Sequence, residues 1–367
     1  MSNICLIYNF AQHYRTNIFT LLDQQLDIDF VFGNEYLNIK KMDYQLLNHK
    51  VTEVKTKQLI GPLDWQCGVI KQLFKGYKKF IMLGKPMSIS TWTALILGRL
   101  MGKDIYFWTH GWYGKESFLK TLIKKAFFGL ATGTMTYGNY ARDLMINEGL
   151  KAEKITTIYN SLMYDEQIKI RKTLVLSDIY KKKFLNSDPI VIFVGRLTTI
   201  KKLDQILKAQ EICRNHNFKF NIVFVGDGTE MDSLKKLAEN LGLSERVWFY
   251  GPSYDEAELS NLIYNADLCV APGNIGLTAM HAMAYGCPCM SHNDFPYQMP
   301  EFEAIREGET GAFFKRDDIN SLADNIMKWF NSPTLSREKI RQDCFREIDR
   351  KWNPHVQIEL IKKAIKE

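Results

Sequence analysis

Two successive runs of alternating strands and helices constrain the fold of this chain more than any other feature of its sequence. The first run extends from Ile4 to Ile158, and the second begins at Pro189. Short apolar segments, such as residues 4–8 and 191–194, predict buried strands, and the amphipathic segments between them predict helices. Parallel strands need a crossover connection, which a helix supplies. The sequence therefore predicts the α/β class, with two doubly wound parallel sheets.

The length of the chain predicts more than one domain, because 367 residues exceed one ordinary core. We expect a first domain over residues 1–175, a second over 176–345, and a helix over 346–367 that crosses back to the first domain. Residues 163–187 carry two basic clusters and little strand signal, which is typical of a linker with its own helix. Ligands bind such sheets at the carboxyl ends of the strands, so two facing domains predict a ligand in a central cleft.

The composition excludes several classes of protein. Hydrophobic residues make up 46% of the chain and charged residues 24%, as in globular domains. The net charge of +7 fits anionic ligands or an anionic membrane surface. No basic arm or nucleic-acid motif accompanies it, so nucleic acid is not an expected partner. The N-terminus lacks a signal-peptide pattern, and no apolar run approaches the roughly 20 residues of a membrane span. The seven cysteines lack zinc-site spacing. These features predict a cytoplasmic protein.

Residues 191–288 bring together the parts of a phosphate site. Gly195 and Arg196 follow a predicted strand, and Lys201 lies five residues after the arginine. Later in this stretch, Gly276 ends a loop that precedes a predicted helix. Arginine can bind phosphate in a bidentate manner, lysine supplies a point charge, and a helix N-terminus presents free amides to an anion. The pattern favours a diphosphate site over ordinary surface residues followed by a plain turn.

The order and spacing of these motifs resemble the nucleotide-sugar half of the retaining glycosyltransferases of family four, the glycosyl transferases group 1. The resemblance covers about half of the chain well and the first half only in outline. The matching residues are Gly195-Arg196-Leu197, Lys201, Val225-Gly226-Asp227-Gly228, Gly251, Asn265-Ala266-Asp267-Leu268, Pro272, Gly276-Leu277, Ala282-Met283-Ala284, Gly286, Pro288, Pro300-Glu301 and Gly308-Glu309-Thr310-Gly311.

The resemblance implies the GT-B fold, in which two Rossmann-like domains face a central cleft. It implies a retaining, metal-independent transfer of a hexose-type sugar from a nucleotide-diphosphate donor to a glycan or lipid-linked acceptor, without a cofactor. Arg196 and Lys201 would stabilise the diphosphate leaving group, which itself would accept the acceptor's proton. The implied setting is bacterial surface polysaccharide assembly, of capsule or O-antigen. The implied donor-binding residues are Gly195, Asn274, Ile275, Gly276, Leu277, Thr278, His281 and Glu301.

The chain departs from the family pattern at two positions. The family has a glutamate at the start of the loop before the helix and a second glutamate after seven further residues. The two glutamates are expected to hold donor sugar hydroxyls and ribose, but here the positions are Gly273 and His281. Asn274 offers a hydrogen-bonding side chain beside the first position. His281 either hydrogen-bonds ribose as a neutral imidazole or is a satisfied core residue. Glu301 either caps backbone amides or contacts the donor sugar.

Three residues of the first half are further candidates for the site. His110 follows a predicted strand and precedes Gly111, and related enzymes have a histidine near this position that contacts the donor sugar. The resemblance therefore implies a catalytic role for His110. His13 and Arg15 lie in the loop after the first strand, and we expect them on the acceptor side, with Arg15 as a possible phosphate contact.

Basic runs in the first half accompany apolar helical faces, one of them in an amphipathic pattern over residues 117–130. These runs are Lys71-Lys75-Lys78-Lys79 and Lys120-Lys124-Lys125. One interpretation is peripheral contact with the inner face of the cytoplasmic membrane, where a lipid-linked acceptor would be presented. The other is a solvated outer face of helices that are buried on their apolar side.

A metal site is not expected, and two rival functions remain open. Asp27-Ile28-Asp29 begins an early strand, far from the donor motifs, and is interpreted as a strand edge. One rival is a GT-B sugar-nucleotide epimerase or hydrolase, which would turn over the donor without an acceptor. The other is a catalytically degenerate partner that only scaffolds another transferase, for which the missing glutamates would be the sign.

Overall fold

The computed structural model describes residues 2–34, 39–332 and 336–367. These residues form two compact units, Met1–Met163 with Asn353–Glu367, and Tyr164–Trp352. The first boundary lies at residue 163 and not at the expected residue 175. The reason is that helix α6 (Tyr164–Arg171) packs on the second unit. Gln167 of this helix donates to Glu256 at 3.2 Å, and Arg171 forms an ion pair with Asp349. The second boundary lies at residue 352, where 345 is expected.

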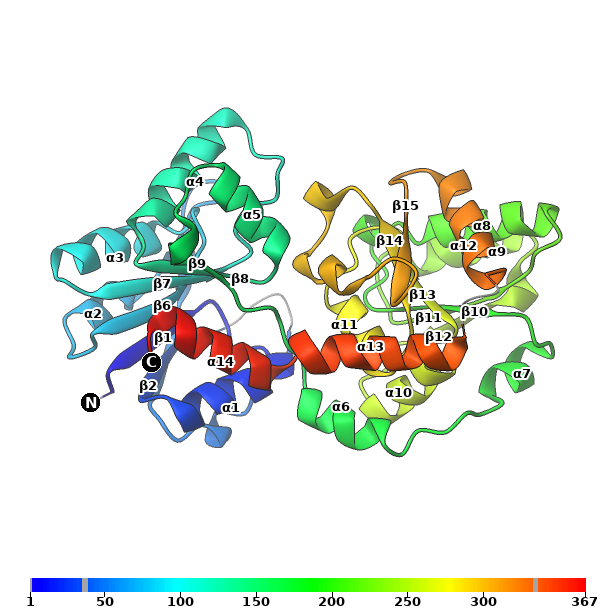
Figure 1. Ribbon diagram of the computed structural model, residues 1–367, viewed down its shortest axis with the longest axis horizontal. Coiled ribbons are helices and arrows are strands. Elements are labelled where there is room, and N and C mark those ends of the chain that lie inside the picture. The colour runs from blue at the N-terminus through cyan, green and yellow to red at the C-terminus, as the bar shows by residue number, and fades with distance from the viewer. Residues whose placement is uncertain (1, 35–38, 333–335) are drawn as a thin grey trace. The chain divides into compact units, whose positions relative to one another are not determined.

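The first unit contains a seven-stranded parallel sheet in the order β3-β2-β1-β6-β7-β8-β9 (Figure 1). Its strands are β1 (Ile4–Tyr8), β2 (Ile28–Gly33), β3 (Val51–Val54), β6 (Lys79–Leu83), β7 (Asp104–Thr109), β8 (Gly133–Thr136) and β9 (Ile155–Thr157). A separate antiparallel pair is formed by β4 (Thr56–Gln58) and β5 (Asp64–Gln66). The helices are α1 (Thr16–Gln25), α2 (Val69–Leu73), α3 (Ile89–Leu100), α4 (Phe118–Leu130), α5 (Asn139–Asn147) and α14 (Pro354–Ile365), with short turns η1 (His13–Arg15), η2 (Tyr44–Leu46) and η3 (Ala152–Lys154).

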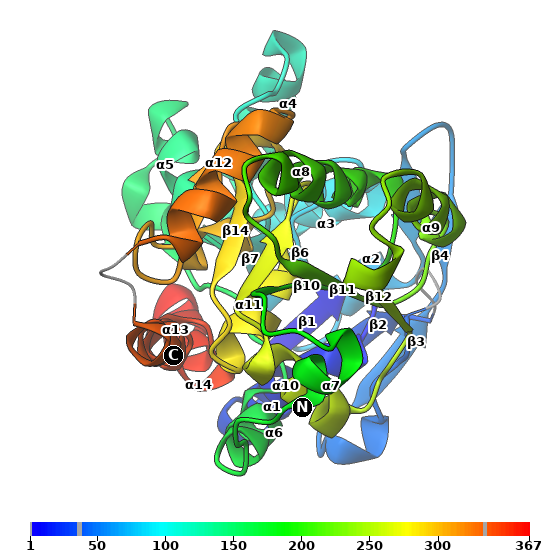
Figure 2. The ribbon, with the colours of Figure 1, turned by 90° about the vertical axis from the view of Figure 1, so that its right-hand side faces the viewer.

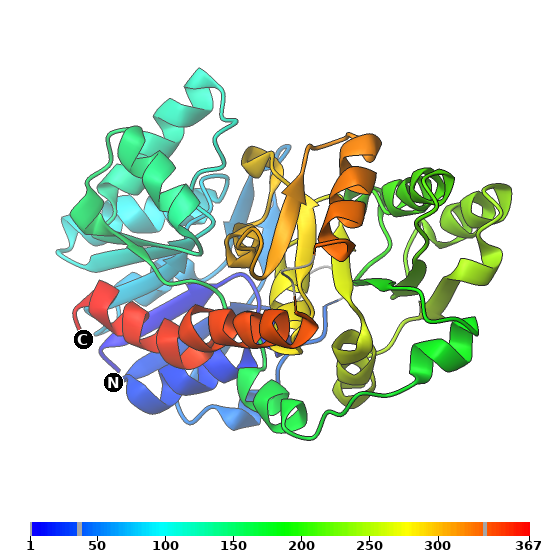
Figure 3. The same ribbon diagram turned by 45° about the vertical axis from the view of Figure 1, so that its right-hand side comes forward.

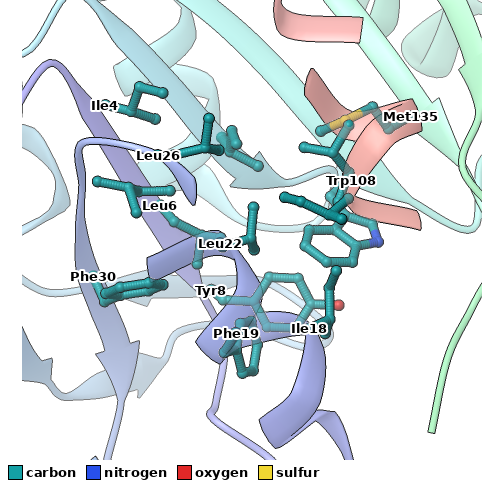
Figure 4. Packing of buried hydrophobic residues seen from close by; sticks show 14 of the residues in the cluster. Ile4, Leu6, Tyr8, Ile18, Phe19, Leu22, Leu26, Phe30, Trp108 and Met135 are labelled. Atoms are coloured by element: carbon teal, nitrogen blue, oxygen red, sulfur yellow. The ribbon is translucent and has the colours of Figure 1, made fainter. Parts of the chain in front are cut away.

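The last helix of the chain completes the core of the first unit. Ile358, Ile361 and Ile365 share one face of α14 and are buried in the same cluster as the apolar residues of β1, β2 and α1. Figure 4 shows part of this cluster, including the side chains of Tyr8 and Trp108. The helix begins at an Asn353 cap, whose side chain accepts from the Val356 amide at 3.0 Å. The final segment of the chain is thus an integral part of the first unit.

The second unit contains a six-stranded parallel sheet in the order β12-β11-β10-β13-β14-β15. Helices α8 and α12 pack side by side (Figure 2), and α12 also lies beside β15 (Figure 3). The strands are β10 (Ile190–Val194), β11 (Asn221–Val225), β12 (Val247–Gly251), β13 (Leu268–Ala271), β14 (Cys289–His292) and β15 (Gly311–Phe314). The helices besides α6 are α7 (Ile179–Phe184), α8 (Asp204–Asn215), α9 (Met231–Asn240), α10 (Glu256–Asn265), α11 (Leu277–Ala284), α12 (Ile319–Phe330) and α13 (Arg337–Lys351), with short turns η4 (Thr199–Lys201), η5 (Ser244–Arg246), η6 (Phe295–Tyr297) and η7 (Pro300–Ala304).

The two parallel sheets confirm the predicted α/β class and doubly wound arrangement. In each sheet the chain moves first toward one edge and then toward the other, starting from β1 and β6 in the first unit and from β10 and β13 in the second. None of the described helices is long and apolar enough to cross a bilayer. Strands β10 and β13 form the switch point of the second sheet, where loops that leave neighbouring strands in opposite directions open a crevice at the carboxyl ends.

Candidate functional site

The sequence motifs of the second unit meet at the switch point of its sheet. Strand β10 pairs with β13 through Val191 with Leu268 and Ile192 with Cys269. The chain leaves β10 toward β11, and it leaves β13 toward β14. The loops 195–201 and 272–276 therefore emerge side by side from the carboxyl edge, where open α/β sheets bind ligands.

Lys201 is anchored on the loop that precedes α11. Its ammonium nitrogen donates to the backbone oxygen and to the side-chain oxygen of Asn274, each at 2.7 Å. Burial lowers the pKa of Lys201 to about 8, and Arg196 acts in the same direction while the negative charge of Glu301 opposes it. The charge of Lys201 is thus held at a defined place, and the structure brings Lys201, Asn274, Arg196 and Glu301 into one neighbourhood.

The N-terminus of α11 presents unused backbone donors at the same place. Gly276 precedes the helix with φ +55° and ψ −146°, a conformation that favours glycine. Within residues 2–34, 39–332 and 336–367, the amides of Gly276, Leu277 and Thr278 donate to no backbone or side-chain acceptor. The Thr278 hydroxyl donates to the Val194 carbonyl at 3.2 Å and so joins α11 to the end of β10. Free amides at a helix N-terminus attract an anion.

The amide of Ile275 has a different role from its neighbours. It donates to the side-chain oxygen of Gln298 at 3.0 Å, and the Gln298 nitrogen donates to the Ser291 hydroxyl at 2.7 Å. Gln298 thereby ties the loop to the end of β14. The Ile275 amide is therefore not available to a ligand, and the expected donor-binding role of Ile275 depends only on the conformation of its backbone. Nothing in the sequence pattern singled out Gln298 as this link.

Gly195 and Arg196 lie on the loop that follows β10. Arg196 is exposed, and its side chain has no hydrogen-bonding or ionic partner in the described part of the chain. Gly195 lies at the end of β10, where an ideal Cβ would lie 3.7 Å from the Thr278 hydroxyl oxygen. Arg196 is close enough to Lys201 to lower its pKa, so the two cations belong to the same part of the unit.

His281 has a carboxylate partner on a neighbouring helix. Its Nε2 atom is 3.1 Å from the Glu256 Oε1 atom, which also accepts from the Tyr285 hydroxyl at 2.6 Å. Burial tends to raise the pKa of Glu256, but the hydrogen bonds from His281, Tyr285 and Gln167 outweigh it and lower this pKa to about 2. The structure thus pairs the residue at the second glutamate position with a carboxylate from α10. Helix α10 is capped by Asp255, whose side chain accepts from the Ala257 and Glu258 amides.

The first unit gathers its candidates at the carboxyl ends of β1, β7 and β8. Arg15 donates to the Tyr137 hydroxyl at 2.9 Å, and the Tyr137 and Tyr8 hydroxyls are 2.8 Å apart. The His110 ring lies 4.9 Å from the Tyr137 ring. Burial and the charge of Arg15 lower the pKa of His110 to about 4, so this imidazole is neutral at pH 7. Arg15 and His110 are therefore neighbours, although they are far apart in the sequence.

His13 lies slightly apart from this group. Its Nδ1 atom is 3.1 Å from the Lys40 carbonyl oxygen, and its ring packs against Tyr14. It shares turn η1 with Arg15, but its ring is engaged with a different loop.

The Asp27-Ile28-Asp29 sequence is occupied by internal contacts at the opposite edge of the first sheet. Asp27 accepts from the Asn3 amide at 2.8 Å, and Asp29 accepts from the Tyr77 hydroxyl at 2.7 Å. Across the described ranges, no group of three or more His, Cys, Asp or Glu side chains is arranged to hold a metal ion. All seven cysteines are free thiols, and six of them are buried.

Comparison with known proteins agrees with this architecture. The chain has the same fold over 99% of its length as Anabaena Alr3699/HepE, whose structure was determined in complex with UDP, with a TM-score of 0.73, 16% identity and 99% of that chain covered. The two units therefore define a protein of the GT-B class. Residues 177–345, all within the second unit, match the model of the glycosyl transferases group 1.

Two curated relatives support the same family at moderate identity. The N-acetyl-alpha-D-glucosaminyl L-malate synthase of Bacillus anthracis is 26% identical over 326 residues, which are 86% of this chain and 78% of that protein. The D-inositol 3-phosphate glycosyltransferase of Mycolicibacterium smegmatis is 33% identical over 155 residues, which are 41% of this chain and 33% of that protein. The putative glycosyltransferase EpsD of Bacillus subtilis is 29% identical over 161 residues, and this match spans only 40% of the length of EpsD.

Proposed function

We propose that this protein is a retaining glycosyltransferase that moves a sugar from a nucleoside-diphosphate donor, bound on the second unit, to a glycan or lipid-linked acceptor. The observation that supports this proposal is a cluster of positive groups at the switch point of the second sheet. It consists of Lys201 and the three unused amides of residues 276–278, and we call it the donor cradle. In the proposed reaction, negative charge develops on the leaving diphosphate, and fixed positive groups aimed at it lower the barrier. Lys201, Arg196 and the α11 amides supply these groups without a metal ion.

The donor side chains other than the cradle have narrower proposed roles. Asn274 would offer a hydrogen-bonding side chain to the sugar, and Glu301 would contribute through its negative charge beside Lys201. His281, with Glu256 behind it, would hydrogen-bond the ribose in place of the missing glutamate. His110 would contact the donor sugar as a neutral imidazole, because its lowered pKa makes it unsuited to proton donation at pH 7.

We further propose that the protein works in bacterial surface polysaccharide assembly, at the inner face of the cytoplasmic membrane. Helix α4 supports this proposal, because four apolar residues near its start are exposed. They are Phe118, Leu119, Leu122 and Ile123, with exposed fractions of 83%, 68%, 47% and 38%. Lys120 lies among them and is exposed. Exposed apolar side chains beside a cation favour the interface of an anionic membrane.

The alternative of a degenerate scaffold is favoured by one observation, the glycine at position 273. An ideal Cβ on Gly273 would lie 2.0 Å from the Ile200 carbonyl oxygen, so the packing is adapted to the absence of the usual glutamate. A scaffold with the same fold would retain this packing but bind nucleotides weakly.

Calorimetric titration with nucleotides distinguishes these two functions. Wild type, Arg196→Ala and the control Arg214→Ala, which changes an arginine on α8, are titrated with UDP, GDP, dTDP and CMP in the presence of a chelator. The transferase proposal expects one nucleotide to bind to wild type and to the control, and at least tenfold more weakly to Arg196→Ala, because a charged contact to phosphate is lost. UDP is the first ligand to test, given its presence in the HepE structure. Absence of binding to every nucleotide would favour the scaffold.

A further inference from the structure

The first unit buries a cation that has no anionic partner. Arg15 is only 6% exposed, and its one side-chain hydrogen bond to another described residue goes to the Tyr137 hydroxyl at 2.9 Å. Its Nε and Nη1 atoms are buried and have no hydrogen-bond partner. Among the described residues, no carboxylate forms an ion pair with Arg15, and its electrostatic neighbours are tyrosines. A buried charge without a counter-charge is costly, and such a group is normally compensated by a partner or a ligand.

Aromatic rings compensate this charge only in part. The Arg15 guanidinium carbon lies 5.7, 5.6 and 5.2 Å from the ring centres of Tyr8, Trp108 and Tyr137. Figure 4 shows the Tyr8 and Trp108 side chains close together, in agreement with their 5.7 Å ring separation. Such contacts hold the cation in place, but they leave its two free N–H groups without an acceptor.

Further unsatisfied polar atoms belong to the chain segments that contribute Arg15 and its neighbours Trp108 and His110. The indole nitrogen of Trp108 and the Nδ1 atom of His110 are buried without partners, as are the side-chain oxygens of Asn9 and Gln12. These residues belong to the loop after β1 and to the end of β7, and His110 contacts Tyr137. His110 is only half-buried, so the group reaches the surface of the unit beside it. Unpaired N–H donors around an arginine fit the oxygens of an anion, and the two amide oxygens fit hydroxyl groups.

We propose that this cluster binds an anionic group of the acceptor, a phosphate or a carboxylate, with Arg15 as its charge partner and Asn9 and Gln12 as contacts to neighbouring hydroxyls. The proposal rests on the proposed function, because it assigns the acceptor to the first unit. It goes further by stating the chemical class of that acceptor. A neutral sugar alone would leave the buried charge uncompensated.

The test first removes the lysine of the donor cradle, so that anions bind more weakly there. The parent variant is Lys201→Met, and the two variants compared in this background are Arg15→Met and Arg142→Met. Arg142 is a matched control on α5, where it contacts only the neighbouring Asp143 at 3.1 Å. Each protein is titrated calorimetrically with inorganic phosphate and with acetate, and its melting temperature is measured with and without each anion.

The proposal expects phosphate or acetate to bind to the parent and to the Arg142 variant, and to raise their melting temperatures. Arg15→Met should bind the anion at least tenfold more weakly and should lose the rise in melting temperature, while folding at least as stably as the parent without anion. The anion that binds identifies the acceptor's charged group. The proposal is overturned if neither anion binds to the parent, or if binding survives in Arg15→Met.

Two further measurements cover a folding failure and a failure of the proposed function. If Arg15→Met does not fold, Tyr137→Phe keeps the arginine but removes its hydrogen-bond partner, and it should weaken anion binding severalfold; unchanged binding would again overturn the proposal. Titration of the single Arg15→Met variant with UDP should match wild type. An Arg15-dependent anion site in a protein that binds no nucleotide would reject the transferase but keep the anion site.

Discussion

Gly273 and Ile200 approach so closely that an ideal Cβ on the glycine would lie 2.0 Å from the Ile200 carbonyl oxygen. The backbone is fixed in this contact, because the Gly273 amide donates to the Lys201 carbonyl at 3.0 Å. The loop that carries Lys201 therefore rests directly on the position where the family has its first glutamate. The close approach at Gly273 and the placement of Lys201 are two aspects of one packing arrangement.

This contact predicts that Gly273→Ala destabilises the protein and displaces Lys201. Overpacking at such a contact costs about 1–3 kcal/mol of unfolding free energy, and the affinity for UDP should fall with it. Urea unfolding and nucleotide titration are the measurements. Gly129→Ala is the control, because a Cβ there meets only the Leu150 side chain, at 4.0 Å, on an exposed part of α4. Wild-type stability and affinity in Gly273→Ala would contradict the close approach.

The lowered pKa of Lys201 predicts a pH-dependent affinity for the nucleotide. The lysine is charged below about pH 8 and neutral above it, so the cradle loses its fixed cation as the pH rises. Phosphate groups complete their last ionisation near pH 6 and do not change in this range. From pH 8 to pH 9 the affinity of wild type for UDP should approach a tenfold decrease per unit. Lys201→Arg keeps its charge and should show a flat profile; a wild-type profile that is equally flat would remove Lys201 from the cradle.

The position of His281 predicts discrimination at the ribose. If its imidazole hydrogen-bonds a ribose hydroxyl, wild type should bind UDP about tenfold more tightly than 2′-deoxy-UDP, in line with the net energy of one hydrogen bond. In His281→Ala the two nucleotides should bind alike, with the change confined to UDP. His216→Ala, at the end of α8, is the control. Equal affinities in wild type would assign His281 to the helix packing alone.

The carboxylate behind His281 predicts a pH-dependent contribution to stability. The pKa of Glu256 is lowered to about 2 in the folded protein, compared with 4.5 ordinarily. Its contribution is therefore present above about pH 4.5 and is lost as the pH falls toward 2. Glu256→Gln should lose about 1–3 kcal/mol of unfolding free energy at pH 7, and the difference from wild type should shrink below pH 4.5. Urea unfolding measures both, with the exposed Glu239→Gln as control. A difference that is independent of pH would rule out the charge effect.

The exposed apolar residues of α4 predict binding to anionic vesicles. The double variant Phe118→Ser with Leu119→Ser should reduce binding to phosphatidylglycerol vesicles roughly tenfold or more, because two large side chains no longer enter the interface. Vesicle co-sedimentation is the measurement. Leu176→Ser changes a residue of the second unit that is 73% exposed and should have no effect. Equal sedimentation of all three proteins would leave α4 without a membrane role.

Hydrophobic periodicity and turn residues in the sequence predicted most of the fold. The segments expected at residues 4–8, 191–194 and 117–130 correspond to β1, β10 and α4, because each is a clear apolar run or amphipathic stretch. Strand β3 was missed because its residues are half-buried and not strongly apolar, and β15 was missed because it begins directly after the glycine-rich turn at 308–311. Short or partly exposed strands are stabilised by pairing with neighbouring strands. This pairing is not visible in the local sequence pattern.

The site was predictable only where a motif carries its chemistry. Arg196, Lys201 and Gly276 stand at fixed spacings, and the structure brings Lys201 to the loop of Gly276. The partnership of His281 with Glu256 joins two helices, and the link from Gln298 to Ile275 joins two loops. Each of these contacts joins residues from different elements of the fold, so no local sequence pattern predicts it. Two lysines of the basic runs have partners that the sequence does not reveal, because Lys124 forms an ion pair with Glu116 at 2.6 Å and Lys79 donates to the Ile365 carbonyl at 2.9 Å.

The contribution of α14 to the first unit has a consequence for biosynthesis. Residues 164–352 are contiguous, so the second unit can fold as soon as they leave the ribosome, whereas the first unit lacks three core isoleucines until residues 353–367 have been translated. The core of the first unit is therefore completed only after the second unit has been synthesised. A stop codon shortly after residue 352 should spare the second unit and leave the first unit exposed to proteolysis.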